Sequence, residues 1–450
     1  MAHNNNNNRY HWANSALFGY LMCLIAWAPL PLGSNRDWST RLLAVLLLLG
    51  LLWAVILWMS GALKASRPLR QALPAVVALL AVQLWVALQL LLGVSVDPAA
   101  TGQALLLGCG LLAAFVLTLA LADSHGRVKK AMQVMVLCGV AQAFFAGFVM
   151  LSGVNSVPLL DKTFYGDMAS GTFVNRNHLA GFLEMSLAIG VGLLVSQLHR
   201  HPAGSWREFW RRIIDTILSH KFQLRLCLAI MVIALVLTRS RMGNMAFFSA
   251  LLICGALGMY LQQRVTRNAV IFFVSLLLID LYIVGNWFGV DQVVERLQNT
   301  SFEQDKRDVV AVDAWVLWKD HFWLGTGADT FFQAYIYGGY KSPDSLFYRH
   351  AHNDYLEIGS GFGFVGFALL AYVVLSSLWQ ALMAQRERHS RLMQGLGLAS
   401  SMGIVAILIH SFADFNLHIT ANSLWFVLLL AFGWIARNQR HARDYARNSP

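Results

Sequence analysis

About twelve apolar segments, each close to 20 residues long, dominate the chain. A helix of about that length crosses the hydrocarbon core of a bilayer, which is roughly 30 Å thick. The segments are continuously apolar and lack the strict alternation of β-barrel strands, so the sequence predicts an all-α, polytopic integral membrane protein. The expected membrane spans run approximately over 14–31, 39–60, 73–92, 103–122, 130–151, 178–197, 222–238, 243–261, 268–286, 358–382, 395–413 and 421–437.

Composition excludes several other classes of protein. Hydrophobic residues make up 57% of the chain and charged residues only 13%, too few to cover the surface of a water-soluble protein of this size. A cytosolic enzyme, a disordered protein and a disulfide scaffold are therefore ruled out. The formal charge of +11 indicates contact with anionic lipid headgroups rather than with nucleic acid.

The basic residues predict the orientation of the chain. Of the connecting segments that alternate between the two sides of the membrane, one set carries 22 Lys and Arg, against 6 in the short loops of the other set. Because basic loops remain in the cytoplasm, and the expected number of spans is even, both termini are expected to be cytoplasmic.

This orientation divides the chain into five parts. They are a cytoplasmic tail (1–13), nine spans (14–286), one large loop on the outer side (287–357), three spans (358–437) and a basic cytoplasmic tail (438–450). Residues 206–217 have the pattern of an amphipathic helix on the cytoplasmic surface. In the large loop, helical spacing predicts a helix with one apolar face, formed by Val309, Val312, Trp315, Val316 and Lys319, which would lie on the membrane or cap a cavity.

Three arginines on the outer side run against the positive-inside pattern. Arg176 precedes the sixth span, and Arg239 and Arg241 lie in a short turn between two later spans. Such side chains often extend to lipid headgroups without a further role. The alternative is an anionic ligand, because the planar guanidinium group binds phosphate through two parallel hydrogen bonds.

Histidines and carboxylates also gather on the outer side. Residues 348–357 contain His350, His352 and two carboxylates, and His410 lies four residues before Asp414. A histidine oriented by a carboxylate is a candidate general base, since imidazole titrates near neutral pH. A polar loop and a satisfied polar pair at a helix end are the simpler interpretations.

Other motifs point to no cofactor. The five cysteines lie in apolar segments, without metal-ligand spacing, and neither H-E-x-x-H nor a phosphate-binding G-x-x-x-x-G-K-[ST] occurs. The glycines of 361–366 match a dinucleotide fingerprint, but they open a membrane span, where small residues serve helix packing. Glu184 and Asp280 are expected to be buried polar groups within spans. We therefore expect no metal and no cofactor.

Five motifs, in this order, resemble those of the O-antigen ligase and Wzy-type polymerase superfamily. They are 171–178 (GTFVNRNH), Ser240-Arg241, 325–327 (GTG), 350–356 (HAHNDYL) and 410–416 (HSFADFN). The resemblance implies a GT-C-like glycosyltransferase of the bacterial inner membrane with a large periplasmic loop. Such enzymes transfer a glycan from undecaprenyl pyrophosphate to a sugar hydroxyl, with inversion and without a metal.

The resemblance also implies roles for individual residues. Arg176 and Arg241 match the arginines that bind pyrophosphate, and His352 matches the catalytic base. Five further residues are assigned to substrate binding by their proximity to these motifs: Arg239, Arg349, His350, Asn353 and Asp414. One position departs from the family pattern, because Gly361 stands where many relatives carry a Glu; Glu357 is a candidate replacement.

Three functions remain open at this stage. A polymerase would join repeat units of O-antigen or exopolysaccharide on lipid carriers, and the run 414–422 resembles members associated with exopolysaccharide polymerisation. A ligase would instead transfer the chain to lipid A core, so the acceptor is either a second lipid-linked unit or the core. A lipid-linked glycan transporter or flippase would show internal repeats, whereas the charged motifs here cluster at the outer edge of the spans.

Overall fold

The computed structural model of the chain describes residues 2–154, 156–157, 162–163, 167–197, 220–261, 274–275, 278, 307–342 and 347–439. The regular secondary structure of these residues is helical, apart from the short antiparallel strands β1 (Ser156–Val157) and β2 (Lys162–Thr163). The expected all-α, polytopic membrane fold is confirmed, and nine helices in the described part are long and apolar enough to cross a membrane.

The helices follow the expected spans closely. Those long enough to span are α2 (Asp37–Met59), α4 (Leu73–Leu91), α5 (Pro98–Leu121), α6 (His125–Ser152), α7 (Arg176–Ser196), α10 (Arg241–Leu261), α15 (Asp354–Glu387), α16 (Arg391–His410) and α17 (Thr420–Asn438). Two of the expected spans correspond to the shorter apolar stretches of α1 (Ala2–Trp27) and α9 (His220–Leu237). The expected span 268–286 and the amphipathic helix 206–217 lie outside the described residues.

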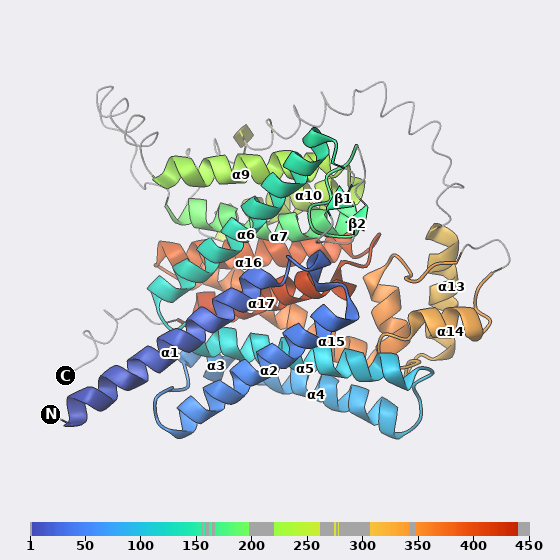
Figure 1. Cartoon of the computed structure of the whole chain (residues 1–450), viewed down its shortest axis with the longest axis horizontal. Coiled ribbons are helices and arrows are strands. Elements are labelled where there is room, and N and C mark those ends of the chain that lie inside the picture. The colour runs from blue at the N-terminus through green and yellow to red at the C-terminus, as the bar shows by residue number, and fades with distance from the viewer. Residues whose placement is uncertain are drawn as a thin grey trace.

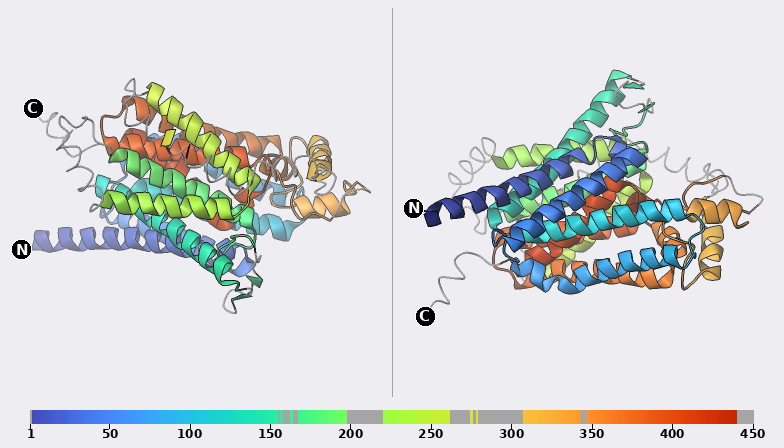
Figure 2. Two further views of the ribbon diagram at one scale, coloured as in Figure 1. Left: turned by 90° about the horizontal axis from the view of Figure 1, so that it is seen from above. Right: turned by 60° about the horizontal axis from the view of Figure 1, so that its bottom comes forward.

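Five shorter helices complete the described chain. They are η1 (Leu32–Ser34), α3 (Arg67–Gln71), α13 (Arg307–Asp320), α14 (Phe331–Tyr337) and η3 (Asn416–His418). Figures 1 and 2 show α13 and α14 together at one end of the long helices.

Side chains at the helix starts explain several boundaries. Asp97 accepts hydrogen bonds from the backbone of residues 99 and 100, and Pro98 occupies the first position of α5. Asn175 and Asn353 cap α7 and α15 in the same way. A capping side chain satisfies backbone donors that the first turn leaves unpaired, typically stabilising the helix by about 1 kcal/mol.

The centre of the bundle consists of α7, α16 and α17. These three helices are buried along most of their length and lie between α9 and α10 on one side and α2, α4 and α5 on the other (Figure 1). The axes of α7 and α16 approach closely at Gly192 and Gly395, where a Cβ on either glycine would lie 2.3 Å from the carbonyl oxygen of the other. The backbones meet here because neither residue has a side chain.

A kink in α15 accommodates the loop between α13 and α14. Gly363 has φ 65° and ψ 177°, outside the helical region. The backbone of Gly325 packs so tightly there that a Cβ would lie 2.3 Å from the carbonyl oxygen of Gly361. Trp85 and Gln89 of α4 donate hydrogen bonds of 2.7 and 3.0 Å to carbonyl oxygens at the kink. The glycines of 361–366 therefore serve packing.

The apolar face expected on α13 is not its buried face. Val312, Trp315 and Val316 are exposed, whereas the buried residues are Val310, Asp313, Ala314, Leu317 and Trp318. Asp313 lies in the buried face because it accepts hydrogen bonds from Ser342 and from the hydroxyl of Tyr335. Hydrophobic spacing does not predict the buried face of α13, because a buried aspartate counts as polar in the pattern even when its hydrogen bonds are satisfied.

Candidate functional site

The motifs recognised in the sequence meet at one end of the bundle, which we call the site end. Here α7, α10, α15 and α17 begin and α16 ends, as the bond from the Asp354 backbone to the Ser411 carbonyl shows for α15 and α16. The helices α13 and α14 lie at the same end (Figures 1 and 2).

Asp414 is the centre of the site. Its Oδ2 accepts a 2.6 Å hydrogen bond from Asn177 Nδ2, and its Oδ1 accepts one of 2.9 Å from the backbone of Phe415. Oδ1 also lies 3.8 Å from His178 Nε2 and 3.7 Å from His352 Nδ1. Burial raises the pKa of this carboxyl, but its interactions with His178 and His352 outweigh burial and hold the pKa well below the usual range. Asp414 is therefore a buried carboxylate at neutral pH.

His352 faces Asp414 from an unusual backbone conformation. Its φ is +49°, in the left-handed region, and its side chain is 15% exposed. The ring packs edge-on against Phe415 and Tyr348, at centroid distances of 5.0 and 5.6 Å. With Nδ1 directed at the carboxylate, the carboxylate favours the tautomer that carries the proton on Nδ1 and leaves Nε2 to accept one.

Arg176 begins α7 directly after the capping Asn175. The Nη1 of Arg176 contacts the sulfur of Met168, and the next residue, Asn177, holds Asp414. The side chain thus lies at a helix N-terminus, where backbone N–H groups and the helix dipole favour an anion. Asn177, the residue after Arg176, and His352 are linked through a single aspartate.

Arg241 begins α10 after the turn formed by residues 238–240. Ser240 closes the turn by accepting a 3.2 Å hydrogen bond from the Gly243 backbone. Gly243 packs against α7, where a Cβ would lie 2.6 Å from Ala180, one turn after Arg176. Arg241 is exposed, and its side chain forms no hydrogen bond or ion pair with the residues that the structure describes. Arg176 and Arg241 therefore begin neighbouring helices that run in the same direction.

The other candidates have different surroundings. Arg239, with φ +51°, forms a 2.7 Å ion pair with Asp167. The Asn353 side chain caps α15 and donates to the Phe412 carbonyl, so it shapes the loop rather than pointing into open space. Arg349 is exposed. The sequence assigned all three to substrate binding; Asn353 directly follows His352, whereas Arg239 is paired with Asp167.

A second cluster lies beside the first. His350 stacks on Phe415 with a centroid distance of 4.0 Å, and its Nδ1 lies 2.7 Å from Glu357 Oε1. His418 lies between Glu357, Asp354 and Asp329. Burial lowers the pKa of His418, but the carboxylates outweigh it and raise the pKa to about 10.

Sequence reasoning gave no role to Asn177, His178, Phe415 or His418. Each lies inside one of the five motifs or within two residues of its end, so the motifs indicated the right segments without indicating these residues. Which of them meet could not be derived, because Asn177 and Asp414 are 237 residues apart. The buried pair of Glu184 and His410, 2.8 Å apart, connects α7 to α16 below the site.

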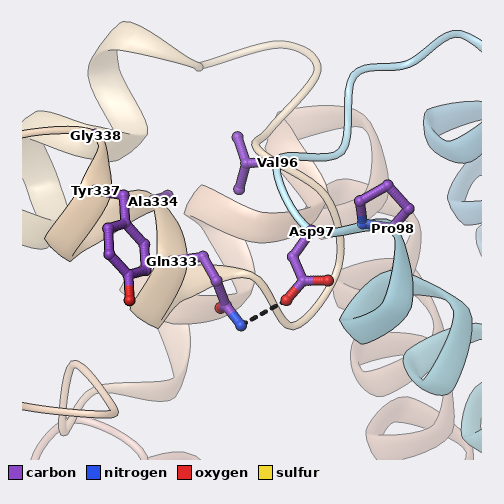
Figure 3. A pocket seen from close by; sticks show the side chains of 7 residues that line it. All are labelled: Val96, Asp97, Pro98, Gln333, Ala334, Tyr337 and Gly338. Atoms are coloured by element: carbon purple, nitrogen blue, oxygen red, sulfur yellow. Dashed lines mark hydrogen bonds between the residues drawn. The ribbon is translucent and has the colours of Figure 1, made fainter.

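An open pocket of about 460 Å³ lies at the same end, between the start of α5 and α14. Figure 3 shows Gln333 reaching Asp97, with Tyr337 on the opposite side of the pocket. The Gln333 amide donates a 2.7 Å hydrogen bond to the Asp97 carboxylate, and the Tyr337 side chain is 81% exposed. No residue of this pocket was predicted from the sequence.

Comparison with known families identifies one domain. Residues 226–371 match the Wzy_C family model, described as O-Antigen ligase. This range includes Arg241 and His352, whereas Arg176 and Asp414 lie outside it. No curated protein matches the chain.

Proposed function

We propose that the chain belongs to the O-antigen ligase superfamily and that it transfers a glycan from undecaprenyl pyrophosphate to a sugar hydroxyl at the periplasmic face of the inner membrane. The family is one of membrane glycosyltransferase-type enzymes that act in lipopolysaccharide and polysaccharide assembly. The observation that carries the proposal is the sharing of Asp414 by Asn177, next to Arg176, and by His352.

In this proposal Arg176 and Arg241 bind the diphosphate. Both begin helices that lie side by side, so the two helix N-termini face the same region. As the bond between the anomeric carbon and the diphosphate oxygen breaks, negative charge grows on the leaving group. Fixed cations and N–H groups stabilise that charge more than the ground state, which accelerates the reaction. No step of the proposed mechanism is assigned to a metal.

His352 acts as the general base. Nε2 takes the proton of the acceptor hydroxyl while that oxygen attacks the anomeric carbon from the side opposite the diphosphate. The product has inverted configuration, and the proton ends on a ring that faces the Asp414 carboxylate. Asp414 stabilises the imidazolium and fixes its tautomer, and it is therefore a positioning residue.

The distribution of charge supports the proposed orientation. Basic residues such as Lys64, Lys130, Arg386 and Arg437 lie at the end of the bundle opposite the site. Basic ends remain in the cytoplasm, so the site end faces the periplasm. Lipid-linked diphosphate would then reach Arg176 and Arg241 from the outer leaflet.

The pocket beside α14 is the proposed binding place for sugars beyond the reacting residue. The exposed ring of Tyr337 offers a flat surface for the C–H face of a sugar, and Asp97 and Gln333 offer hydrogen bonds to hydroxyl groups. Asp329, which precedes α14, lies 3.5 Å from His418, so the pocket and the histidine cluster belong to connected elements.

Polymerisation is the activity we favour, on the strength of the run 414–422, with ligation to lipid A core as the alternative. The test uses the purified full-length protein in lipid nanodiscs with a synthetic lipid-pyrophosphate oligosaccharide. The acceptor is either a second molecule of that donor or lipid A core. A ladder of products identifies a polymerase, one shifted glycolipid identifies a ligase, and no product with either acceptor contradicts glycan transfer.

A further inference from the structure

Four side chains, one of them His418, direct nitrogen and oxygen atoms toward one another. His350, Glu357 and His418 offer ligand atoms that all lie within 4.8 Å of each other. Glu357 Oε1 is 2.7 Å from His350 Nδ1 and 3.6 Å from His418 Nε2. Asp354 Oδ1 is 3.8 Å from the same His418 nitrogen.

Two of these atoms are buried without a hydrogen-bond partner. Asp354 Oδ2 accepts bonds from the Ser411 hydroxyl and the Leu417 backbone, whereas Oδ1 has no partner although the side chain is only 1% exposed. His418 Nε2 is also unpartnered. Buried polar atoms are normally hydrogen-bonded, whereas these two form only an ion pair of 3.8 Å, so a ligand between them would complete their bonding.

The orientation of His418 suits a metal ligand. Its Nδ1 lies 3.5 Å from Asp329 Oδ1, so an N–H at Nδ1 points to a carboxylate, and Nε2 points into the cluster, where a bound metal ion would replace its proton. Histidines that bind metals usually hold their second nitrogen in this manner. Glu357 is held similarly, because its Oε2 accepts a 2.9 Å bond from the Ala351 backbone and leaves Oε1 for the cluster.

We propose that His350, His418, Glu357 and Asp354 form a binding site for one divalent transition-metal ion, with Zn²⁺ as the best match. Two imidazoles and two carboxylates provide the nitrogen and oxygen ligands that zinc accepts in four-coordinate sites. The 30% exposed side chain of His350 provides the route of entry. This site goes beyond the proposed glycan transfer, which assigns no step to it.

The ion would join two segments that carry the proposed base. His350 comes two residues before His352, and His418 comes four residues after Asp414. Phe415 lies between the histidines, stacked on His350 and edge-on to His352. A metal ion coordinated by both His350 and His418 would hold their two segments together beside Phe415. It would thereby also fix the facing pair of His352 and Asp414.

The test measures metal directly, on full-length protein in nanodiscs that has been treated with chelator and then freed of it. Addition of ZnCl₂ followed by gel filtration should leave one zinc per chain by mass spectrometry. Addition of CoCl₂ should give visible absorption bands of low-symmetry coordination, which Zn²⁺ then removes. His418→Gln and Glu357→Gln should weaken binding by roughly 10–100-fold or more, because even lost outer partners have effects of that size.

His350→Gln is the variant that separates binding from folding, since this side chain is partly exposed. It should elute as the native protein does and still lose metal affinity. His389→Gln, in an exposed segment at the opposite end of the bundle, is the matched control and should retain one zinc. A zinc content far below one in the native protein, or equal affinity in His350→Gln and His389→Gln, would overturn the proposal. No substrate is present, so this outcome is independent of whether glycan is transferred.

Discussion

Asn177 at the start of α7 donates a 2.6 Å hydrogen bond to Asp414 in the loop between α16 and α17. The same carboxylate faces His352 at 3.7 Å, so one side chain connects the segment of the first arginine to the segment of the histidine. This relationship brings the residue after Arg176 and His352 to the same carboxylate, and the prediction for the base depends on it.

Replacement of the base should abolish transfer. His352→Ala should lower kcat by about 10²–10⁴-fold, the usual contribution of a general base, while the protein still inserts in the membrane. Asp414→Asn should also lower kcat, because the amide favours the wrong tautomer of His352. Product formation from the lipid-pyrophosphate donor measures both, and full activity of His352→Ala would remove the base assignment.

The two helix-start arginines should not tolerate lysine. Arg176→Lys and Arg241→Lys are expected to lose roughly 10²–10³-fold in kcat, because an ammonium group cannot form two parallel bonds to the diphosphate. Arg239→Lys is the matched control, since its exposed ion pair with Asp167 contributes about 0–1 kcal/mol of stability and can re-form with lysine. If all three variants lose the same activity, the two arginines have no special role.

Low pH should destabilise the protein by protonating the buried carboxylate of Asp414. A carboxyl whose pKa is depressed by folding stabilises the protein above its unfolded pKa, near 3.9, and this contribution is lost as the pH falls through the lower folded value. Thermal unfolding of the native protein should therefore show a loss of stability below about pH 4 that Asp414→Asn does not share. Parallel Tm profiles for the two proteins would contradict the depressed pKa.

The contact between α7 and α16 should not tolerate a side chain at Gly192. Gly192→Val requires the two helices to separate, because its first carbon atom would lie 2.3 Å from the Gly395 carbonyl oxygen. We expect a loss of about 1–3 kcal/mol or more of stability, measured as a lower Tm in detergent. Gly102→Val in α5 is the control, since a Cβ there meets nothing within 4 Å.

The pocket beside α14 should affect substrate affinity more than chemistry. Tyr337→Ala removes the exposed ring and should raise KM for the glycan with little change in kcat, whereas Tyr337→Phe keeps the ring and should behave as the native enzyme does. Steady-state kinetics with donors of different glycan length provide the measurement. An unchanged KM in Tyr337→Ala would remove this pocket from the glycan path.

Local patterns predicted much of the fold. The expected start at 178 lies two residues from the observed start of α7, and the expected start at 243 lies two residues from that of α10. Hydrophobic length carries this information because each span must satisfy its own backbone in lipid. The same pattern predicted the helix α13 but not its buried face, since the contacts of Asp313 with Ser342 and Tyr335 depend on how distant segments pack.

The sequence by itself determined the membrane-spanning helices, their expected orientation and the motifs that carry arginine and histidine. Helix formation and insertion depend on neighbouring residues, which a single chain displays in order. The tertiary structure alone decided that Asn177 and His352 share Asp414. It also decided that His350, Glu357 and His418 meet, with His350 stacked on Phe415. These contacts require helices far apart in the chain to pack side by side, and no local pattern records which helices do so.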